Sequence, residues 1–323
     1  TLLPMASPAP SPPDAAPAPG EATTLDRLLE GPGGGGVAVV DGPRRHTVAS
    51  IGAEAAALAG GLRALGVGRG DVVAWQLPNW REAIVLFRAC WQLGAVAAPL
   101  HHRSGEPEVA EQLALLGPRA VLAAPGLPAG SAAGAIEVRG DGGDGGGDGS
   151  YDDLLSHAVA PGGVATPDDR AVVLFTSGST DGPKGVVHTH RSLGHKARTM
   201  PNVHGLTATD VVLMPAPLAH VSGLLNGVLL PGTVGMTVVL MEQWNPAEAL
   251  RLIETERVSF LVGPPTFFLE LIEARAFSPE RMASLRVVSC GGTGVTPAFV
   301  EDASERLGAR VKRSYGSTEA PTV

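Results

Sequence analysis

Residues 174–187 read Leu-Phe-Thr-Ser-Gly-Ser-Thr-Asp-Gly-Pro-Lys-Gly-Val-Val and carry the strongest local signal in the chain. An apolar run leads into a loop rich in threonine, serine and glycine, and Lys184 stands near the start of a second apolar run. Glycines let backbone N–H groups close on an anion, hydroxyls supply further donors, and the lysine adds a positive charge. The stretch therefore predicts a loop that cradles phosphate groups.

Two better-known loops do not fit these residues. A Walker loop needs Ser or Thr directly after its lysine, whereas Lys184 lies between Pro183 and Gly185. A hydrolase nucleophile elbow needs serine between its glycines, and Thr180 occupies that position. A plain polar hairpin turn is a further reading, because serine, threonine and glycine are common turn residues.

Helical and apolar segments alternate on both sides of this loop. Helices are expected at residues 54–65, 80–93, 106–116, 246–256, 266–276 and 297–307. Strands are expected at residues 72–76, 95–100, 120–124, 171–176, 211–215, 233–241, 259–262, 286–289 and 310–314. Near-continuous apolar strands separated by helices predict an α/β fold whose sheet is covered on both faces.

Composition limits the class of protein. The chain has 323 residues, 44% of them hydrophobic, which suggests two domains or one large one with ample core material. It carries 24 Lys plus Arg against 32 Asp plus Glu, a net charge of −8. A protein that binds nucleic acid through the phosphate backbone needs a basic surface, so no nucleic-acid partner is expected.

Two segments are expected to stay outside the folded core. Residues 1–20 are rich in proline and alanine and should form a disordered tail. Residues 140–149 read GDGGDGGGDG and should form a flexible surface loop. A calcium-binding turn is the alternative for this loop, but a single copy without apolar positions supports it poorly.

Cysteine usage and hydropathy bear on the compartment. Cys90 and Cys290 lie far apart and match no zinc spacing, which favours reduced thiols in a cytoplasmic protein. No signal peptide is evident. Val221 to Met241 carries no charge, but proline and glycines interrupt it. We expect a buried pair of elements joined by a turn at Pro231-Gly232 rather than a membrane span.

Three further segments combine glycine with groups suited to ligands. Tyr315-Gly-Ser-Thr-Glu319 offers a ring for a base, a hydroxyl for phosphate and a carboxylate for Mg²⁺, although alone it also suits a helix N-cap. Ser289 to Pro297 contains the adjacent pair Gly291 and Gly292 between an expected strand and a helix, where backbone can approach a ligand. His220 lies in an apolar segment, which is typical of a packed core histidine.

Together these segments resemble the adenylate-forming enzymes, which comprise acyl-CoA synthetases, luciferases and the adenylation domains of peptide synthetases. The family's loop pattern is Thr-Ser-Gly-Ser/Thr-Thr-Gly-x-Pro-Lys-Gly, and the chain matches it at Thr176, Ser177, Gly178, Ser179, Thr180, Pro183, Lys184 and Gly185. It departs at Asp181, where the family has glycine. A carboxylate at that position would repel a triphosphate unless it points outward.

The resemblance assigns roles to the matching residues. It implies that the loop from Thr176 to Lys184 holds the β- and γ-phosphates and that Thr180 and Glu319 serve Mg²⁺. It implies that Tyr315 stacks on adenine, with Gly316 and Ser317 beside it, and that Thr318 contacts the α-phosphate. The remaining residues would line the adenine and acyl pocket, with His220 at the carboxylate: His220, Gly291, Gly292 and Thr293. Lys184, His220, Thr318 and Glu319 would then be catalytic.

The pocket chemistry narrows the substrate. No acidic residue occurs between Val211 and Met241, and an apolar pocket cannot hold an ammonium group unpaired. This favours a plain carboxylic acid over an amino acid. The sequence PLAHVSGLLNGVLLP at residues 217–231 is most similar to that of medium-chain or alicyclic acid–CoA ligases. This resemblance would place the enzyme in fatty acid metabolism.

The resemblance covers residues 25–323, and it implies one large N-terminal AMP-binding domain over residues 21–323, with stacked sheets and flanking helices. Family members continue into a small C-terminal lid, which we expect this chain to lack. The implied reaction joins a carboxylic acid to coenzyme A with ATP and Mg²⁺, through an acyl-adenylate. A non-catalytic or truncated nucleotide-binding fragment is the alternative. A phosphotransferase is less favoured, because no candidate base stands near Lys184.

Overall fold

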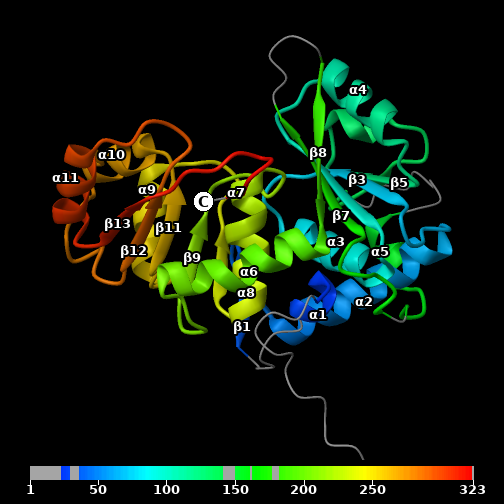
Figure 1. The fold of residues 1–323 in the computed structure, drawn as a ribbon, viewed down its shortest axis with the longest axis horizontal. Helices are drawn as coiled ribbons and strands as arrows, with labels where there is room; N and C mark the ends of the chain where they lie inside the picture. Colours follow the sequence, from blue (N-terminus) through cyan, green and yellow to red (C-terminus); the bar gives the residue numbers. More distant parts are fainter. Residues whose placement is uncertain (1–22, 30–35, 141–149, 161, 177–181, 322–323) are drawn as a thin grey trace, which may run out of the picture.

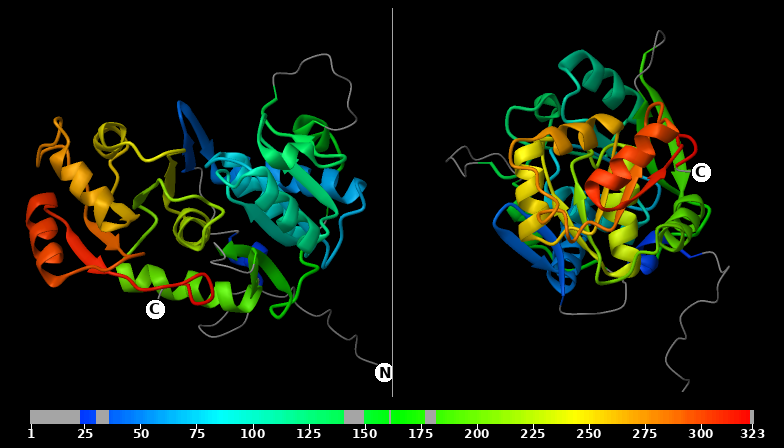
Figure 2. Two further views of the ribbon diagram at one scale, coloured as in Figure 1. Left: turned by 90° about the horizontal axis from the view of Figure 1, so that it is seen from above. Right: turned by 90° about the vertical axis from the view of Figure 1, so that its left-hand side faces the viewer.

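The computed structural model describes residues 23–29, 36–140, 150–160, 162–176 and 182–321 (Figure 1). The expected tail at 1–20, nearly all of the glycine loop at 140–149, and residues 177–181 of the phosphate loop lie outside these residues. Two sheets form two lobes, and α6 (His190–His204) runs across from the six-stranded sheet toward the seven-stranded sheet (Figures 1 and 2). Within the described residues, no helix is long and apolar enough to cross a membrane.

The first sheet has seven strands in the order β13-β12-β11-β9-β10-β1-β2. Its neighbouring strands are parallel except for the antiparallel pair β1 and β2. In chain order, the strands are β1 Val37–Asp41, β2 Arg44–Thr47, β9 Val211–Met214, β10 Thr237–Leu240, β11 Phe260–Gly263, β12 Val287–Cys290 and β13 Arg310–Arg313. Parallel strands end at one edge of a sheet, so the loops that follow β9 to β13 gather on one side.

The second sheet has six strands in the order β6-β5-β3-β4-β7-β8 and is parallel except for β7 and β8. The strands are β3 Val72–Gln76, β4 Val96–Leu100, β5 Ala120–Ala123, β6 Ile136–Glu137, β7 Arg170–Thr176 and β8 Lys184–Thr189. In the β7–β8 hairpin, Thr176 is the register partner of Lys184. The two ends of the expected phosphate loop are therefore side by side.

Helices surround and separate the sheets. They are α1 Leu25–Leu28, α2 Val48–Ala64, α3 Arg81–Leu93, α4 Glu106–Leu116, α5 Tyr151–Leu155, α6, α7 Val221–Gly223, α8 Leu230–Val234, α9 Pro246–Thr255, α10 Pro265–Glu273 and α11 Pro297–Leu307, with a 3₁₀ turn η1 Pro128–Ser131 and a π-helix η2 Leu224–Leu229. Local signals set many ends. In α11, the Thr296 hydroxyl accepts the Phe299 N–H, Pro297 begins the helix, and Gly308 ends it at φ +63°.

The central strands of the seven-stranded sheet, β9 to β12, are buried on both faces. Val212 and Val287 belong to the core shared with η2, whereas their chain neighbours Leu213 and Val288 belong to the core under α9 to α11. Successive side chains of a strand point to opposite faces, so a strand between two cores must be apolar at every position. The expected α/β fold with a doubly covered sheet is confirmed.

One predicted turn between two elements is wrong. The uncharged stretch from Val221 to Met241 is a pair of buried elements, as predicted, but no turn occurs at Pro231-Gly232. A continuous helical segment runs through α7, η2 and α8 to Val234, and Gly235 ends it at φ +78°. Pro231 stands in the first turn of α8 after the wide π-helical segment, where a missing N–H is tolerated. Gly232 lies against Leu29, since a Cβ there would come within 2.4 Å of the leucine Cδ2.

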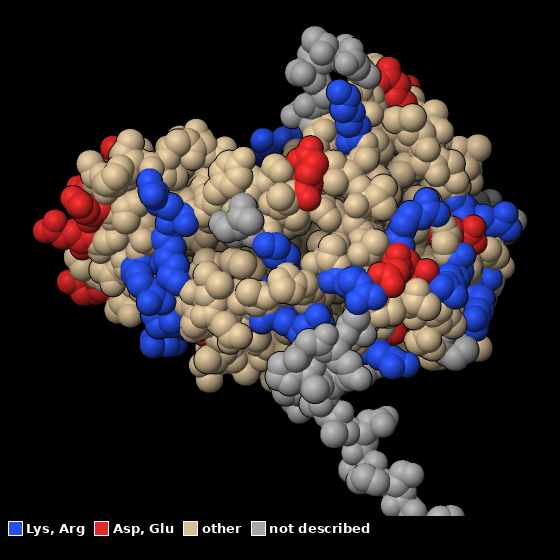
Figure 3. All heavy atoms as spheres, viewed as in Figure 1, with Lys and Arg blue, Asp and Glu red and all other residues tan. Residues whose placement is uncertain are grey.

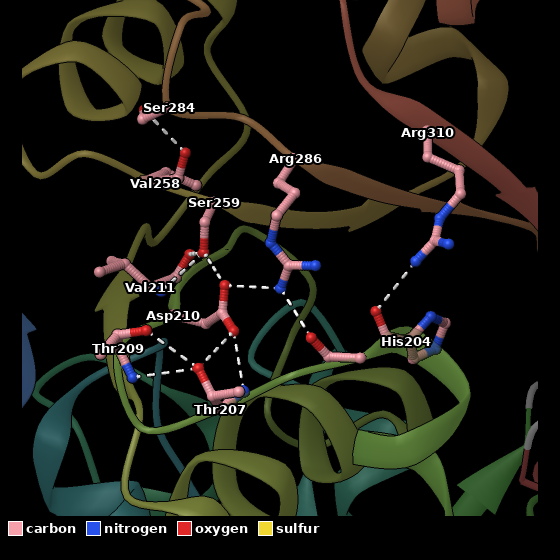
Figure 4. A network of polar contacts seen from close by, with 11 residues as sticks. His204, Thr207, Thr209, Asp210, Val211, Val258, Ser259, Ser284, Arg286 and Arg310 are labelled. Atoms are coloured by element: carbon pink, nitrogen blue, oxygen red, sulfur yellow. Dashed lines mark hydrogen bonds and ion pairs between the residues drawn. The ribbon is translucent and has the colours of Figure 1, made fainter.

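The C-terminal end of α6 is anchored to the seven-stranded sheet. Arg286 donates to the carbonyl of Gly205 at 2.9 Å and to Asp210 at 2.8 Å, while Arg310 donates to the carbonyl of His204 at 3.4 Å (Figure 4). Cations stabilise the negative end of a helix dipole. Lys and Arg side chains form a band over the β12–β13 region on the face shown in Figure 3.

His204 should make folding sensitive to acid. Burial, with smaller contributions from Lys312 and Arg310, lowers the pKa of His204 from 6.5 to about 4. The unfolded chain then binds more protons between those pH values, so this stability is fully present above pH 6.5 and is lost as pH falls toward 4. Between pH 7.5 and pH 5.0 the loss from this group is about 2 kcal/mol.

Urea unfolding of the wild type and of His204→Phe at both pH values checks this prediction. Phenylalanine removes the titration and keeps a ring beside Phe260, whose centroid lies 5.1 Å from that of the histidine. We expect the variant to lose about 2 kcal/mol less than the wild type on acidification. Equal losses of unfolding free energy in the wild type and in His204→Phe would contradict the prediction.

Candidate active site

A cavity of about 530 Å³ lies where strands of both sheets end. Its walls come from the segments that follow β4, β9, β10, β12 and β13, together with the end of β11. In open α/β sheets, ligands bind at the carboxyl ends of the strands. Five residues predicted from the sequence line this cavity: His220, Gly291, Gly292, Tyr315 and Gly316.

The other predicted residues lie elsewhere. Ser177, Gly178, Ser179 and Thr180 lie outside the described residues. Among those described, the cavity lining does not include Thr176, Lys184, Thr293, Ser317, Thr318 and Glu319. Thr176 and Lys184 stand at the two ends of the hairpin loop, and Lys184 is exposed. The cavity therefore brings together His220, Tyr315 and the glycine turn formed by Gly291 and Gly292. The predicted hydroxyl groups and Lys184 belong to neighbouring segments.

The glycine turn after β12 has a steric reason. A Cβ on Gly291 would lie 2.4 Å from the carbonyl oxygen of Ser314, and Gly292 has φ +80°. The Ser314 N–H donates to the carbonyl of Cys290 at 2.8 Å, which holds the ends of β12 and β13 together. Glycine at position 291 thus allows the close contact that brings Tyr315 to the cavity.

The Tyr315–Glu319 segment contains a turn, not the start of a helix. Ser317 and Ala320 exchange backbone hydrogen bonds at 3.2 Å, and Tyr315 is 73% exposed at the cavity. The backbone N–H of Glu319 and the hydroxyl of Ser317 lower the pKa of the Glu319 carboxyl, so it is ionised at neutral pH. The N-cap reading of this segment is wrong for the described residues, which end at 321.

His188 joins this segment to the β7–β8 hairpin, and sequence reasoning missed it. The histidine Nε2 lies 2.7 Å from the carbonyl oxygen of Thr318, and both residues are buried. Side chains alternate along a strand, so Lys184 and His188 share one face of β8. The only sequence signal was this period-two spacing after the lysine.

Three residues after β4 form a second wall that sequence reasoning also missed: His101, His102 and Arg103. The His101 and His102 rings stack at 4.9 Å between centroids. Burial, followed by the nearby charges of His102, Arg103 and His220, lowers the pKa of His101 to about 4. The cavity therefore holds His101 as a neutral imidazole at pH 7.

The ring tautomers of the cavity histidines follow from their backbone contacts. His220 Nδ1 accepts the Ser222 N–H at 3.2 Å, and His101 Nδ1 accepts the Arg103 N–H at 3.1 Å. Burial also lowers the pKa of His220. A neutral ring whose Nδ1 is an acceptor carries its proton on Nε2. Each ring can therefore offer one neutral N–H donor to an oxygen atom.

An aromatic pair forms the apolar wall of the cavity. The rings of Trp244 and Phe267 stack at 4.1 Å with an angle of 6° between their planes. The indole Nε1 donates to Glu270 at 2.6 Å and fixes the outer ring. This wall suits an apolar group. Its signal in the sequence was weak, because one tryptophan and one phenylalanine 23 positions apart form no motif.

The comparison with protein-family models identifies the fold. The model of the AMP-binding enzyme family matches residues 30–323. The chain belongs to the family of AMP-binding enzymes. In this member of the family, the cavity lies at the carboxyl ends of strands, with the glycine turn and the tyrosine on its wall.

Curated relatives of this AMP-binding enzyme are CoA ligases and synthases. A medium-chain fatty-acid–CoA ligase of Escherichia coli is 31% identical over 315 residues, which span 88% of this chain and 53% of the relative. A feruloyl-CoA synthase of an Amycolatopsis species is 34% identical over 295 residues, spanning 88% of this chain and 56% of the relative. The chain thus spans about half the length of the curated relatives it matches.

Solved structures agree with the fold. The inhibitor-bound N-terminal domain of FACL13 from Mycobacterium tuberculosis matches with a TM-score of 0.81 and 28% identity, covering 92% of this chain and 76% of that one. ATP-bound MatB from Rhodopseudomonas palustris matches with a TM-score of 0.82 and 25% identity, covering 92% of this chain and 60% of that one. The expected fold, an N-terminal domain of an adenylate-forming enzyme, is confirmed.

Proposed function

We propose that the chain is the ATP- and acid-binding part of an ATP-dependent acid–CoA ligase. One observation carries the proposal: a single cavity brings together His220, the glycine turn at Gly291 and Tyr315, which stand almost a hundred residues apart. The names of the relatives, which are ligases and synthases that join acids to coenzyme A, support it. Residues 21–323 would form one domain, and a C-terminal lid would complete the enzyme.

The proposed reaction has two steps. A carboxylate oxygen of the acid bonds to the α-phosphorus of ATP, and the bond from that phosphorus to the bridging oxygen breaks, which releases pyrophosphate. The thiol sulfur of coenzyme A then bonds to the acyl carbon, AMP leaves with the oxygen, and the thiol proton passes to solvent. A hinged lid is the usual device by which one site serves two steps.

Different residues of this chain would contact different parts of ATP and the metal ion. The loop from Thr176 to Lys184 would hold the leaving phosphates, where fixed donors stabilise the developing charge. Tyr315 would stack on adenine, and Thr318 would contact the α-phosphate. Glu319, together with Thr180, would serve Mg²⁺, which neutralises phosphate oxygens. A single ionised carboxylate fits this role, because Mg²⁺ in such sites takes one or two carboxylates plus substrate phosphates.

The acid would be a plain, apolar carboxylic acid. Trp244, Phe267 and Val262 line the cavity, and the neutral histidines would donate N–H groups to the carboxylate. Glu242 also lines the cavity, one residue beyond the stretch without acids. Its Oε1 accepts the Trp80 Nε1–H at 2.6 Å, which ties this carboxylate to the indole ring. With both cysteines free, we place the enzyme in the cytoplasm.

Acid-dependent exchange between ATP and pyrophosphate tests the proposal in the full-length gene product. We expect exchange with some members of a panel of aliphatic and aromatic acids. Binding of ATP without exchange for any acid would leave a non-catalytic nucleotide-binding protein instead.

Lys184→Met should weaken binding of MgATP by 10- to 100-fold, since a hydrogen bond to a charged group contributes about 1.5–3 kcal/mol. Isothermal titration of the purified chain with MgATP measures this loss. Lys196→Met is the matched control, because it removes the same charge from α6 and not from the end of the β7–β8 loop. Equal affinity for wild type and the Lys184 variant would remove the lysine from the phosphate site.

A further inference from the structure

Two buried side-chain amides follow one another at the end of β3. Gln76 is the last residue of the strand and has no exposed surface, and Asn79 stands three residues later with 2% of its surface exposed. Burying an amide without partners costs free energy, so each must be fully hydrogen-bonded to be tolerated. Both are, and their partners include one residue of each cavity wall, His101 for Gln76 and Ala216 for Asn79.

Gln76 is hydrogen-bonded to the His101 wall of the cavity, which is formed by His101, His102 and Arg103 after β4 of the six-stranded sheet. Its Nε2 donates to the carbonyls of His101 and Ser104, each at 3.1 Å. Its Oε1 accepts the Ala129 N–H at 2.9 Å, which ties the same amide to η1. The turn that carries His101, His102 and Arg103 is therefore fixed at its beginning and at its end by one side chain.

Asn79 is hydrogen-bonded to the His220 wall of the cavity, which is formed by residues 215–222 after β9 of the seven-stranded sheet. Its Nδ2 lies 3.2 Å from the carbonyl of Met214, 2.9 Å from that of Ala216 and 3.1 Å from that of Met241. Its Oδ1 accepts the Leu218 N–H at 2.8 Å, two residues before His220. One amide from the segment after β3 thus binds the ends of β9 and β10 in the other sheet.

We infer that Gln76 and Asn79 are positioning residues that together set the spacing between the His101 wall and the His220 wall of the cavity. Only Leu77 and Pro78 stand between the two residues in the chain, and each of the two amides is hydrogen-bonded to one of the walls. Because the proposed acid would lie between these walls, the spacing would set its affinity. Only this last step rests on the proposed function.

Hydrogen exchange of the purified chain without ligand tests the positioning itself. In Asn79→Leu, a side chain of similar size with no polar atoms, we expect the amides of His220, Ser222 and Leu224 to exchange at least 10-fold faster. Amides of β3 and β4 should change less than 2-fold. Trp80→Phe is the matched control, because it removes the 2.6 Å bond to Glu242 from the same segment but keeps both amides.

Equal acceleration of all amides would show a contribution to global stability alone, and unchanged exchange at His220 would show no contribution; either result overturns the inference. If Asn79→Leu does not fold, Asn79→Ser, which leaves room for water, is measured in the same way. Gln76→Leu should accelerate exchange at Arg103 and Ser104, whose N–H groups bond within the His101 turn, and not at His220.

A kinetic split then tests the functional step in the full-length protein. Asn79→Leu should raise KM for the acid at least 10-fold and leave KM for ATP within 3-fold, because the hydrogen bonds of this amide go to the segments after β9 and β10 and not to the glycine turn or Tyr315. A loss of kcat with both KM values unchanged would overturn the functional step. Absence of activity in the wild type as well would contradict the proposed function, and the exchange result would stand independently.

Discussion

Gly223→Ala is expected to lower the free energy of unfolding by about 3 kcal/mol, at the upper end of overpacking effects. A Cβ at this position would lie 2.0 Å from the carbonyl oxygen of Pro217 and 2.9 Å from the Cα of Leu218. Both are backbone atoms, so no side-chain rotation relieves the overlap. The helix that begins after His220 must move away from the segment that precedes it.

Urea unfolding of the purified chain measures the loss. Gly52→Ala is the control, because this glycine lies within α2 and a Cβ added to it would meet nothing within 4 Å. Alanine there should stabilise by about 0.5–1 kcal/mol through helix propensity. A Gly223 variant as stable as the wild type would show that the segment around His220 adapts, and would contradict the tight packing derived for it.

Sequence reasoning succeeded where local chemistry sets the boundary of an element. The bounds of α4 and α11 were predicted to the residue because each ends at a glycine in the left-handed conformation, Gly117 and Gly308. The β3 strand was equally clear, since its five apolar or amide residues stand between polar turns. Such boundaries depend on a few neighbouring residues and do not need the rest of the fold.

Other elements were missed because their local signals conflict. In α6, Leu193, Ala197 and Met200 have helical spacing, but Gly194 and Pro201 within the helix obscure it. The β1–β2 hairpin was missed because half of its length, Arg44–Thr47, is polar. The turn expected at Pro231-Gly232 was wrong for the opposite reason: a strong local turn signal yields to a helix whose residues 223–231 are all buried.

The candidate site shows the same division. The glycine and tyrosine motifs belong to segments after β12 and β13 that line the cavity, and each could be noticed because it is continuous in the chain. The wall formed by His101 and its two neighbours was invisible, because the sequence does not say which strand ends of two different sheets meet. The contacts of Asn79, which joins those ends, were invisible for the same reason.

Gly291→Ala should have the largest effect on the nucleotide side of the cavity. A Cβ at this position would lie 2.4 Å from the carbonyl oxygen of Ser314 and 2.5 Å from its Oγ. The Gly291 N–H also donates to the carbonyl of Gly263 at 3.2 Å, so the turn cannot move back without breaking a bond to β11. The end of β13 must therefore shift, and Tyr315 shifts with it.

We expect this variant to bind ATP at least 100-fold more weakly, since a displaced ring and broken backbone contacts together exceed about 2.7 kcal/mol. The free energy of unfolding should fall by about 2 kcal/mol, within the usual range for overpacking. Gly294→Ala, three residues on and with nothing within 4 Å, is the matched control and should change neither quantity by much.

Unfolding is measured without ligand, so it reports on the packing whether or not ATP is the ligand. A stable variant with unchanged affinity would show that Tyr315 does not depend on the turn, whereas loss of affinity at full stability would place the whole effect on the tyrosine.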